Sequence, residues 1–234
     1  MCGKFTALAS WREIVEFSQA FTGGDSSGEG GNEGGGEEIA TYRVGGQVPV
    51  IIRDPETGKR RVVPMRWGFP DVRDWRRPKP IHARAETIDE RQAFRDAFLI
   101  CQTGIVIFDT FNEGEEAETS GGKPKTIQWT VTPKPSRPRG FAFLWRRFDI
   151  LDLPAPILCC VMVTVPASQL VREKIKPKEE DPRQPAIFDD GAPWAPWLGE
   201  VATTPAERKA LLKTVEGVTW TAAPEPKKPR PRKG

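Results

Sequence analysis

The residue with the clearest chemical potential is Cys2, which follows Met1 at the start of the sequence. A cysteine at this position is small enough for Met1 to be removed, which leaves an α-amine and a thiol on one residue. The pKa of an α-amine is about 8 and that of a thiol about 8.5, so both groups are reactive at neutral pH. An aldehyde, such as the ring-opened sugar of an abasic site, condenses with the amine to an imine, and the thiol closes a thiazolidine ring. An incidental cysteine is the alternative for so short a segment.

Two further segments combine cations with an aromatic ring. Arg66 and Trp67 are adjacent, and a tryptophan beside an arginine offers a base-stacking face next to a phosphate-binding cation. Arg84, in the segment Ile81–Thr87, is a second candidate for phosphate because of its forked guanidinium group. The alternative is that Trp67 belongs to the core and that Arg84 pairs with Glu86 or another acid.

Two acidic residues lie near the end of the apolar segment Gly104–Phe111: Asp109 is within the segment, and Glu113 is two residues beyond it. A carboxyl group at the end of a buried strand is partly desolvated, which raises its pKa toward a proton-donor role. A solvated loop is the alternative, because further acids follow at Glu115, Glu116 and Glu118.

The cysteines and the single histidine lack the spacing of a metal site. The cysteines are Cys2, Cys101, Cys159 and Cys160. They contain no Cys-x-x-Cys pair, and the only histidine is His82, whereas zinc needs spaced Cys or His ligands. We therefore expect no metal and no other cofactor. Cys159 and Cys160 lie in the apolar run Ala155–Val165 and are predicted to pack as small buried residues.

Taken in order, the motifs resemble the SOS-response-associated peptidase (SRAP) family along the chain, apart from residues 23–38 and the C-terminal tail. The motifs are Met1-Cys2-Gly3, Arg66-Trp67-Gly68, Ala83–Thr87, Phe111-x-Glu113, Phe141–Trp145 and Arg183-x-Pro185. The first and the third are the most specific. The resemblance implies a curved-sheet α+β fold with a basic cleft for single-stranded DNA. It also implies autocatalytic removal of Met1 and a thiazolidine crosslink between Cys2 and an abasic site in the DNA damage response.

The resemblance also implies roles for individual residues. Glu113 matches the catalytic glutamate of the family, and we expect Cys2, His82 and Asp181 beside it as catalytic residues. The expected DNA-binding residues are Lys4, Arg66, Trp67, Arg84, Thr164 and Arg183. The peptidase activity in the family name is interpreted as removal of Met1 rather than digestion of other proteins.

Some positions depart from the family pattern. An asparagine is replaced by His82, a histidine by Asp181, an arginine by Lys4, and a Tyr-Glu-Trp segment by Asn112-Glu113-Gly114. One hypothesis is that His82 and Asp181 form an exchanged polar pair around Cys2, in which the neutral imidazole shuttles a proton. The competing hypothesis is a divergent member that binds DNA but crosslinks slowly or reverses poorly.

Hydrophobic patterning predicts an α+β fold built on curved, mostly antiparallel sheets, which form an open barrel-like core with a few flanking helices. Strands are expected at residues 41–44, 48–53, 61–63, 104–111, 126–132, 140–145 and 157–164. Helices are expected at residues 5–21, 88–98, 166–175 and 206–214, the last with Thr204 as its cap and Pro205 in its first turn. Residues 54–58 are expected to form a hairpin turn, and the Gly- and Glu-rich residues 112–124 a loop.

We expect one domain at residues 1–223, interrupted by a flexible Gly/Glu-rich loop at 23–38, and a disordered basic Pro/Lys/Arg tail at 224–234. The net charge of the chain is +3, and residues 227–234 carry five positive side chains and no acid. Subtracting these five charges leaves −2 for the remainder. A nucleic-acid site in the domain must therefore be a local basic patch.

The sequence also limits the class of protein and its location. The sequence contains no run of 18 apolar residues, so we expect no membrane span. It also lacks a cationic segment followed by an apolar one, so we expect no secretory signal. We expect a monomer that remains in the cytoplasm, where it can associate with a nucleoid, and whose partner is single-stranded DNA with abasic sites.

Two other functions remain open. Amidotransferases with an N-terminal nucleophile also begin Met-Cys-Gly, but they need Arg and Asn-Gly elements that hold glutamine, and we find no convincing set. A non-covalent nucleic-acid-binding protein would use the cations without the cysteine. The first would release ammonia from glutamine, and the second would form only salt-sensitive complexes.

Overall fold

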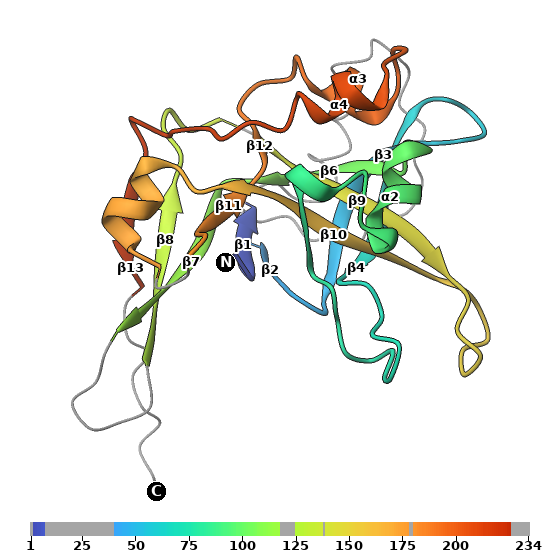
Figure 1. Ribbon diagram of the computed structural model, residues 1–234, viewed down its shortest axis with the longest axis horizontal. Helices are drawn as coiled ribbons and strands as arrows, with labels where there is room; N and C mark the ends of the chain where they lie inside the picture. The colour runs from blue at the N-terminus through green and yellow to red at the C-terminus, as the bar shows by residue number, and fades with distance from the viewer. Residues whose placement is uncertain (1, 8–39, 118–124, 138, 178–179, 226–234) are drawn as a thin grey trace, which may run out of the picture.

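A computed structural model describes residues 2–7, 40–117, 125–137, 139–177 and 180–225, which form two sheets with a few short helices (Figure 1). The smaller sheet has the strand order β13-β8-β7-β1-β2. Its strands are β1 (Lys4–Ala7), β2 (Ala40–Arg43), β7 (Thr110–Ala117), β8 (Lys125–Thr132) and β13 (Thr221–Pro224). All its pairings are antiparallel.

The larger sheet curls into a ring. Its strands are β3 (Gln47–Arg53), β4 (Arg60–Trp67), β5 (His82–Arg84), β6 (Thr103–Phe108), β9 (Arg139–Phe148), β10 (Ile157–Pro166), β11 (Arg183–Pro185) and β12 (Ile187–Phe188). Strands β10, β4, β3, β6 and β9 follow one another, and β9 pairs back with β10.

The ring is not a complete barrel. Strand β3 meets β6 through the single pair Ile51 and Ile105, and β4 meets β10 through two residue pairs. The contacts of β10 with β4 and β5 are parallel, whereas the others in the ring are antiparallel. The predicted α+β fold, with curved and mostly antiparallel sheets around an open barrel-like core, is confirmed.

Alternating side chains of the ring strands build two cores, one on each face of the strands. On β9, Phe141 and Phe143 pack into the cluster that contains Cys2, whereas Ala142 and Leu144 pack into the other. This is the period of two that an extended chain imposes, and it explains why β9 is buried on both faces. Cys2 therefore lies in the cluster enclosed between the two sheets.

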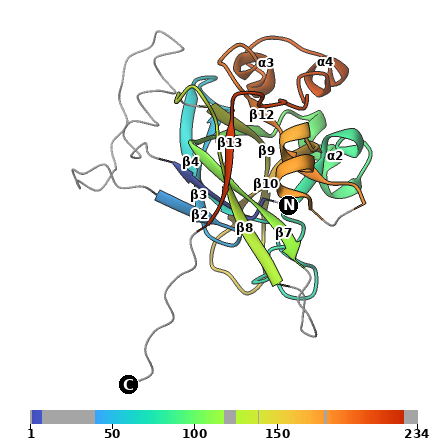
Figure 2. The ribbon, with the colours of Figure 1, turned by 90° about the vertical axis from the view of Figure 1, so that its left-hand side faces the viewer.

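The helices are short. They are η1 (Ala85–Thr87), α2 (Gln92–Leu99), the π-helical turn η2 (Val171–Ile175), α3 (Trp194–Leu198) and α4 (Pro205–Lys209). Helices α2 and α3 pack on the second core, whereas the turn η2 packs on the core that contains Cys2. Figure 1 shows α2, α3 and α4 on the side of the ring opposite to β8 and β13, and Figure 2 shows β7, β8 and β13 from their outer side. No helix in the described part of the chain has the length and apolar character needed to cross a membrane.

The predicted strands at 41–44, 48–53, 61–63, 126–132, 140–145 and 157–164 are confirmed within a few residues, as is the hairpin turn at 54–58. Among the helices, α4 has the predicted cap, in which Thr204 and Glu207 form a reciprocal capping box, but it ends at Lys209 rather than Thr214. The predicted helix at 88–98 begins only at Gln92, and that at 166–175 reduces to η2.

Two predictions were wrong in the described residues. Residues 5–7, expected in a helix, belong to β1, and residues 8–21 of that helix lie outside the described residues, as does the loop at 23–38. Residues 112–117, expected in a loop, belong to β7, while 118–124 lie outside the description. In both cases strand pairing outweighs the local composition: β1 pairs with β2 and β7, which are distant in sequence, and residues 112–117 pair with the next strand, β8.

The segment expected as one strand at 104–111 is divided at Asp109, whose backbone N–H donates to the carbonyl oxygen of Thr6 at 2.9 Å. The chain leaves the ring as β6 at this residue and enters the smaller sheet as β7. This corner brings the strand that carries Glu113 alongside β1. Strand β13 extends one residue into the segment expected as tail, because Pro224 pairs with Trp129.

Candidate functional site

Cys2 lies two residues before Lys4, the first residue of β1, at the junction of the two sheets, and the residue is only 1% exposed. Strand β1 is held between β2 and β7, and Phe5 pairs with Tyr42 on one side and Phe111 on the other. The Cys2 thiol donates to the carbonyl oxygen of Lys4 over 3.4 Å. Residues 2–7 are thus fixed by packing and by pairing on both sides.

Glu113 is the charged group that acts on the Cys2 thiol. It is fully buried on β7, two residues beyond Phe111. Burial raises the pKa of Cys2 well above its usual range, and the charge of Glu113 raises it further, against hydrogen bonds with the backbone of Lys4 and Asn112. The thiol is therefore protonated at neutral pH, and any attack by the sulfur requires a group that accepts its proton.

His82 holds the main chain of Cys2. Its Nε2 lies 2.7 Å from the Cys2 carbonyl oxygen, and because that oxygen can only accept, Nε2 must carry the proton. Burial lowers the pKa of His82 to about 4, so the ring is neutral at neutral pH. Its Nδ1 is buried and has no hydrogen-bond partner among the described residues. His82 therefore fixes the backbone of Cys2 rather than its sulfur.

Asp181 does not join His82. Its carboxylate lies 3.1 Å from Nη1 of Arg84 and 3.5 Å from Nη1 of Arg183, so two guanidinium groups bind it. The exchanged His82–Asp181 pair expected around Cys2 is thus not formed in the structure, because each side chain has a different partner. Asp181 therefore belongs to an ion cluster with Arg84 and Arg183.

Arg183 and Thr164 are buried at the base of that cluster. Arg183 is 3% exposed, and its Nη2 donates to Glu86 at 2.6 Å and to the Thr164 carbonyl oxygen at 2.9 Å. Burial raises the pKa of Glu86, but the hydrogen bond from Arg183, a hydrogen bond to its own backbone and the charges of Arg183 and Arg84 together outweigh burial and leave the pKa below its usual range. The hydroxyl of Thr164 donates to the Ala83 carbonyl oxygen. These two residues support the surface from below.

Arg84 and Lys4 lie nearer the solvent. The side chain of Arg84 is 59% exposed, with Asp181 as its ion-pair partner. Lys4 forms an ion pair with Glu225, which also accepts from the Asn112 side chain at 2.9 Å. Of the six residues expected to bind DNA, Arg84 is therefore the one whose cationic group is most accessible.

Trp67 and Arg66 occupy positions different from those expected. Trp67 is fully buried, packs against Phe5 and Phe143, and donates from Nε1 to the Ile81 carbonyl oxygen at 3.2 Å. Its ring thus belongs to the core, the alternative noted from the sequence, and offers no face to a base. Arg66 donates to two carbonyl oxygens of the loop that follows β4.

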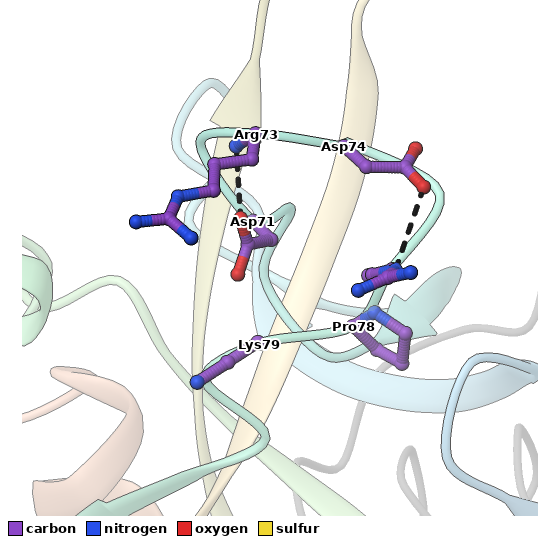
Figure 3. Close-up of a pocket in the computed structure, with 6 residues that line it drawn as sticks. Asp71, Arg73, Asp74, Pro78 and Lys79 are labelled. Carbon is purple, nitrogen blue, oxygen red and sulfur yellow. Dashed lines mark hydrogen bonds and ion pairs between the residues drawn. The ribbon is translucent and has the colours of Figure 1, made fainter.

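The loop between β4 and β5, which we call the basic loop (residues 70–80), was not singled out from the sequence. It carries the exposed cations Arg73, Arg76, Arg77 and Lys79. Part of it surrounds a hollow of about 580 Å³ (Figure 3). The available signal was a run of cations between prolines, with Trp75 among them.

The site thus has two parts. A buried centre (Cys2, His82 and Glu113) contains a protonated thiol, a neutral imidazole that holds the main chain, and a carboxylate whose charge reaches the thiol. The second part is a surface of exposed cations, formed by Arg84 and the arginines of the basic loop, which can bind anions. Such an arrangement can combine nucleophilic chemistry at a residue near the chain start with recognition of a polyanion.

The family model of the SOS response associated peptidase (SRAP) matches residues 1–226. The abasic site processing protein YoqW of Bacillus subtilis (strain 168) is 26% identical over 219 residues, which cover 91% of this chain and 87% of that protein. The abasic site processing protein YobE of the same strain is 27% identical over 216 residues, which cover 91% and 88%.

Solved structures share the fold. A protein of Bordetella bronchiseptica superposes with a TM-score of 0.69 at 21% identity, covering 96% of this chain and 100% of its own. A protein of Bacteroides thetaiotaomicron superposes with a TM-score of 0.61 at 21% identity, covering 79% and 76%. These likenesses show that the two-sheet arrangement occurs in distant sequences.

Proposed function

Because the chain belongs to the SOS response associated peptidase (SRAP) family, we propose that it binds single-stranded DNA and captures abasic sites covalently through Cys2. Its relatives in Bacillus subtilis are named abasic site processing proteins. The observation that carries the proposal is the buried centre: Cys2 is held at its carbonyl by His82, and the charge of Glu113 acts on its thiol.

Capture begins with exposure of the Cys2 amine. Water adds across the peptide bond between Met1 and Cys2 and releases methionine, which is the peptidase step. The amine then adds to the aldehyde carbon of the open sugar, and the carbinolamine loses water to give an imine. The sulfur adds to the imine carbon and the thiol proton passes to the nitrogen, which closes the thiazolidine. Condensation releases one water and needs no oxidant or cofactor.

Glu113 is the proton carrier in this scheme. The thiol has a raised pKa, so it forms a nucleophile only when a neighbouring base takes its proton. The Glu113 carboxylate accepts that proton, and in the preceding step its protonated form donates to the departing hydroxyl of the carbinolamine. A positioned carboxyl group can transfer a proton in both directions, as a general base when ionised and as a general acid when protonated.

His82 acts as a positioning residue. Its hydrogen bond to the Cys2 carbonyl oxygen limits the orientations of the residue that carries both reacting groups. Holding the amine and the thiol on one side of the incoming aldehyde lowers the entropic cost of ring closure. Nε2 donates in this bond, which by itself raises the pKa of His82, but the larger effect of burial keeps the ring neutral at neutral pH.

We assign DNA binding to the surface cations. Arg84 binds a backbone phosphate, while Arg183 and Thr164 support the strand edge beneath it. Asp181, which the sequence suggested as a catalytic residue, acts in this assignment on Arg84 and Arg183 instead. The unit of function is one domain acting as a monomer, with single-stranded DNA as its partner.

The test is a denaturing gel of the protein with a single-stranded oligonucleotide that carries one abasic site, run beside Cys2→Ala and an intact-mass measurement that detects Met1. The matched DNA control carries the same site reduced to an alcohol, which has no aldehyde. We expect a shifted band that survives denaturant for the aldehyde alone and only with Cys2. If the mass shows that Met1 has been removed, and the protein binds the strand under native conditions but gives no shifted band in the denaturing gel, it is a non-covalent nucleic-acid-binding protein.

A further inference from the structure

The basic loop (residues 70–80) is a fixed element rather than a loose connection. Pro70 and Pro78 face each other across it as an isolated antiparallel bridge. Main-chain hydrogen bonds join its two sides, from Phe69 to Pro80, from Lys79 to Phe69 and from Asp71 to Arg77. The loop is therefore built like an irregular hairpin that projects from the ends of β4 and β5.

Its acidic residues are occupied in shaping the chain. The carboxylate of Asp71 accepts from the backbone N–H of Arg73 at 2.8 Å, and that of Asp74 accepts from the N–H of Arg76 at 3.1 Å. Aspartates that bond to the backbone two residues ahead are a common device for fixing turns. These acids therefore determine the path of the loop and leave the cations on its outside.

An arginine and a tryptophan brace the loop from within. Arg66 of β4 donates to the carbonyl oxygens of Trp75 and Arg76. The guanidinium carbons of Arg66 and Arg76 lie 5.9 Å and 5.0 Å from the centroid of the Trp75 ring, which gives two cation–π contacts on one side chain. Arg66 is thus committed to holding the loop.

The remaining cations point outward. The side chain of Arg77 is 81% exposed, and its ion-pair distance to Asp74 is 3.7 Å, so this exposed pair is weak. Arg73 and Lys79 are also exposed, and Figure 3 shows both on one side of the hollow, with Asp71 between them. With two acids and four cations, the loop has a net charge of +2, whereas the chain without its last eight residues has −2.

Both ends of the loop are attached to the site. Trp67, which precedes it, donates to the carbonyl oxygen of Ile81, and the next residue is His82, which holds Cys2. Pro78 packs so closely on Gly68 that a Cβ at Gly68, whose φ is +112°, would lie 2.3 Å from the Cβ of Pro78. Only glycine fits this contact, and it fixes where the loop leaves the site.

The reach of the loop matches a nucleic-acid strand. From its base to its tip run about four residues, which span roughly 14 Å when extended. The phosphates of one strand recur about every 3.4 Å along the axis of a duplex and lie further apart in an extended single strand, so a single strand beside the loop presents more than one of them. Because arginine binds phosphate through two parallel hydrogen bonds, Arg73 and Arg77 suit such a ligand better than a single point charge would.

We propose that the basic loop is a second phosphate-binding surface, on which the DNA strand continues after it passes Cys2. This inference rests on the proposed function, since it places on the loop the strand whose abasic site reaches the buried centre. Arg73, Arg77 and Lys79 bind successive backbone phosphates without reading the bases. Arg76 and Arg66 keep the loop in shape through Trp75.

The test compares two variants that each lose three exposed cations. One is Arg73→Gln, Arg77→Gln, Lys79→Gln in the loop. The other, the matched control, is Arg91→Gln, Arg95→Gln, Arg147→Gln, which changes exposed arginines outside the loop. Binding of an intact single-stranded oligonucleotide is measured by fluorescence anisotropy over a series of salt concentrations, and thermal unfolding checks that each variant keeps its fold.

The loop variant should bind roughly tenfold or more weakly at low salt, and the slope of log K against log salt should fall by about 2, because each lost phosphate contact removes about 0.7. The control should keep the slope of the unchanged protein. A loop variant with an unchanged slope and affinity would overturn the inference. If the triple variant loses its fold, Arg77→Gln alone should lower the slope by about 0.7, and an unchanged slope for that variant has the same meaning.

The two proposals fail in different ways. If the unchanged protein forms no covalent band but the loop variant still loses affinity, capture through Cys2 is refuted and the loop assignment stands. If the unchanged protein forms the band and the loop variant binds the strand equally well, the loop assignment is refuted and capture stands.

Discussion

The buried centre and the basic loop are constructed in opposite ways. The buried centre takes one residue from the start of β1, one from β5 and one from β7, and these strands belong to two different sheets. The basic loop is one continuous segment whose turns are fixed by its own aspartates. The first depends on the whole fold, whereas the second depends mainly on residues a few positions apart.

This difference separates chemistry from affinity. In the buried centre, polar groups are removed from water, so their protonation states are shifted and each change there alters both reactivity and stability. On the surface, exposed charges interact weakly with one another and remain available to an anion. Substitutions should therefore divide into those that change rate or stability and those that change only salt-dependent binding.

The largest expected effect is that of Glu113→Gln. This change keeps the size of the side chain but removes the group that we assign to proton transfer, so the rate of crosslinking should fall about 10²- to 10³-fold. Single-turnover denaturing gels measure that rate, and anisotropy with the reduced abasic site measures affinity, which should change less than about twofold. A rate within a factor of three of the unchanged protein would remove Glu113 from the mechanism.

The next effect concerns pH and stability. Burial lowers the pKa of His82 to about 4 in the folded protein, while an unfolded histidine titrates at about 6.5. Between these values the unfolded chain binds a proton that the folded chain does not, so the stabilisation present above pH 6.5 is lost as the pH falls toward 4. The full shift corresponds to roughly 3 kcal/mol.

His82 is the only histidine, which makes the measurement clean. Urea unfolding at pH 7, 6, 5 and 4.5 should show the unchanged protein losing about 2 to 3 kcal/mol more than His82→Asn over this range. Comparing the two proteins cancels the carboxylates that titrate in both. Parallel curves for the two proteins would show that His82 is not buried in a neutral state in solution.

The same contrast explains what the sequence could predict. The strands at 48–53, 126–132 and 157–164 were found because runs of β-branched and apolar residues carry their own signal. Residues 112–117 were missed, because a strand rich in Gly and Glu is specified by its pairing with β8, which local patterning does not contain.

The site was predictable to a similar extent. Cys2, Glu113 and His82 were identified as candidates from their types and their motifs, but the contact between His82 and the Cys2 carbonyl spans 80 residues and follows only from the pairing of β5 with β10. The burial of Trp67 follows from packing between the two sheets, whose geometry the motif does not encode. The sequence therefore predicted which residues are candidates for the site, but not which residues they contact.

The smallest expected effect is that of Asp181→Asn, and it tests the surface part of the comparison. The Asp181 carboxylate binds the guanidinium groups of Arg84 and Arg183, so a DNA phosphate must compete with it. An exposed ion pair contributes up to about 1 kcal/mol, so removing it should strengthen binding of single-stranded DNA about twofold to fivefold at low salt. The gain should vanish at high salt because both interactions are screened.

Glu86→Gln is the matched control, since Glu86 is exposed to a similar extent as Asp181 but binds the buried guanidinium group of Arg183 more closely, at 2.6 Å rather than 3.5 Å. Weakening that bond leaves a buried guanidinium group less well compensated, so the control should lose about 1 to 3 kcal/mol of stability instead of gaining affinity. Anisotropy and urea unfolding of both variants measure the two quantities. If Asp181→Asn left affinity unchanged at every salt concentration while Glu86→Gln strengthened it, the carboxylate that competes with phosphate would be the one on Glu86. In that case Glu86 would belong to the surface that binds DNA and not to the buried residues that stabilise the fold.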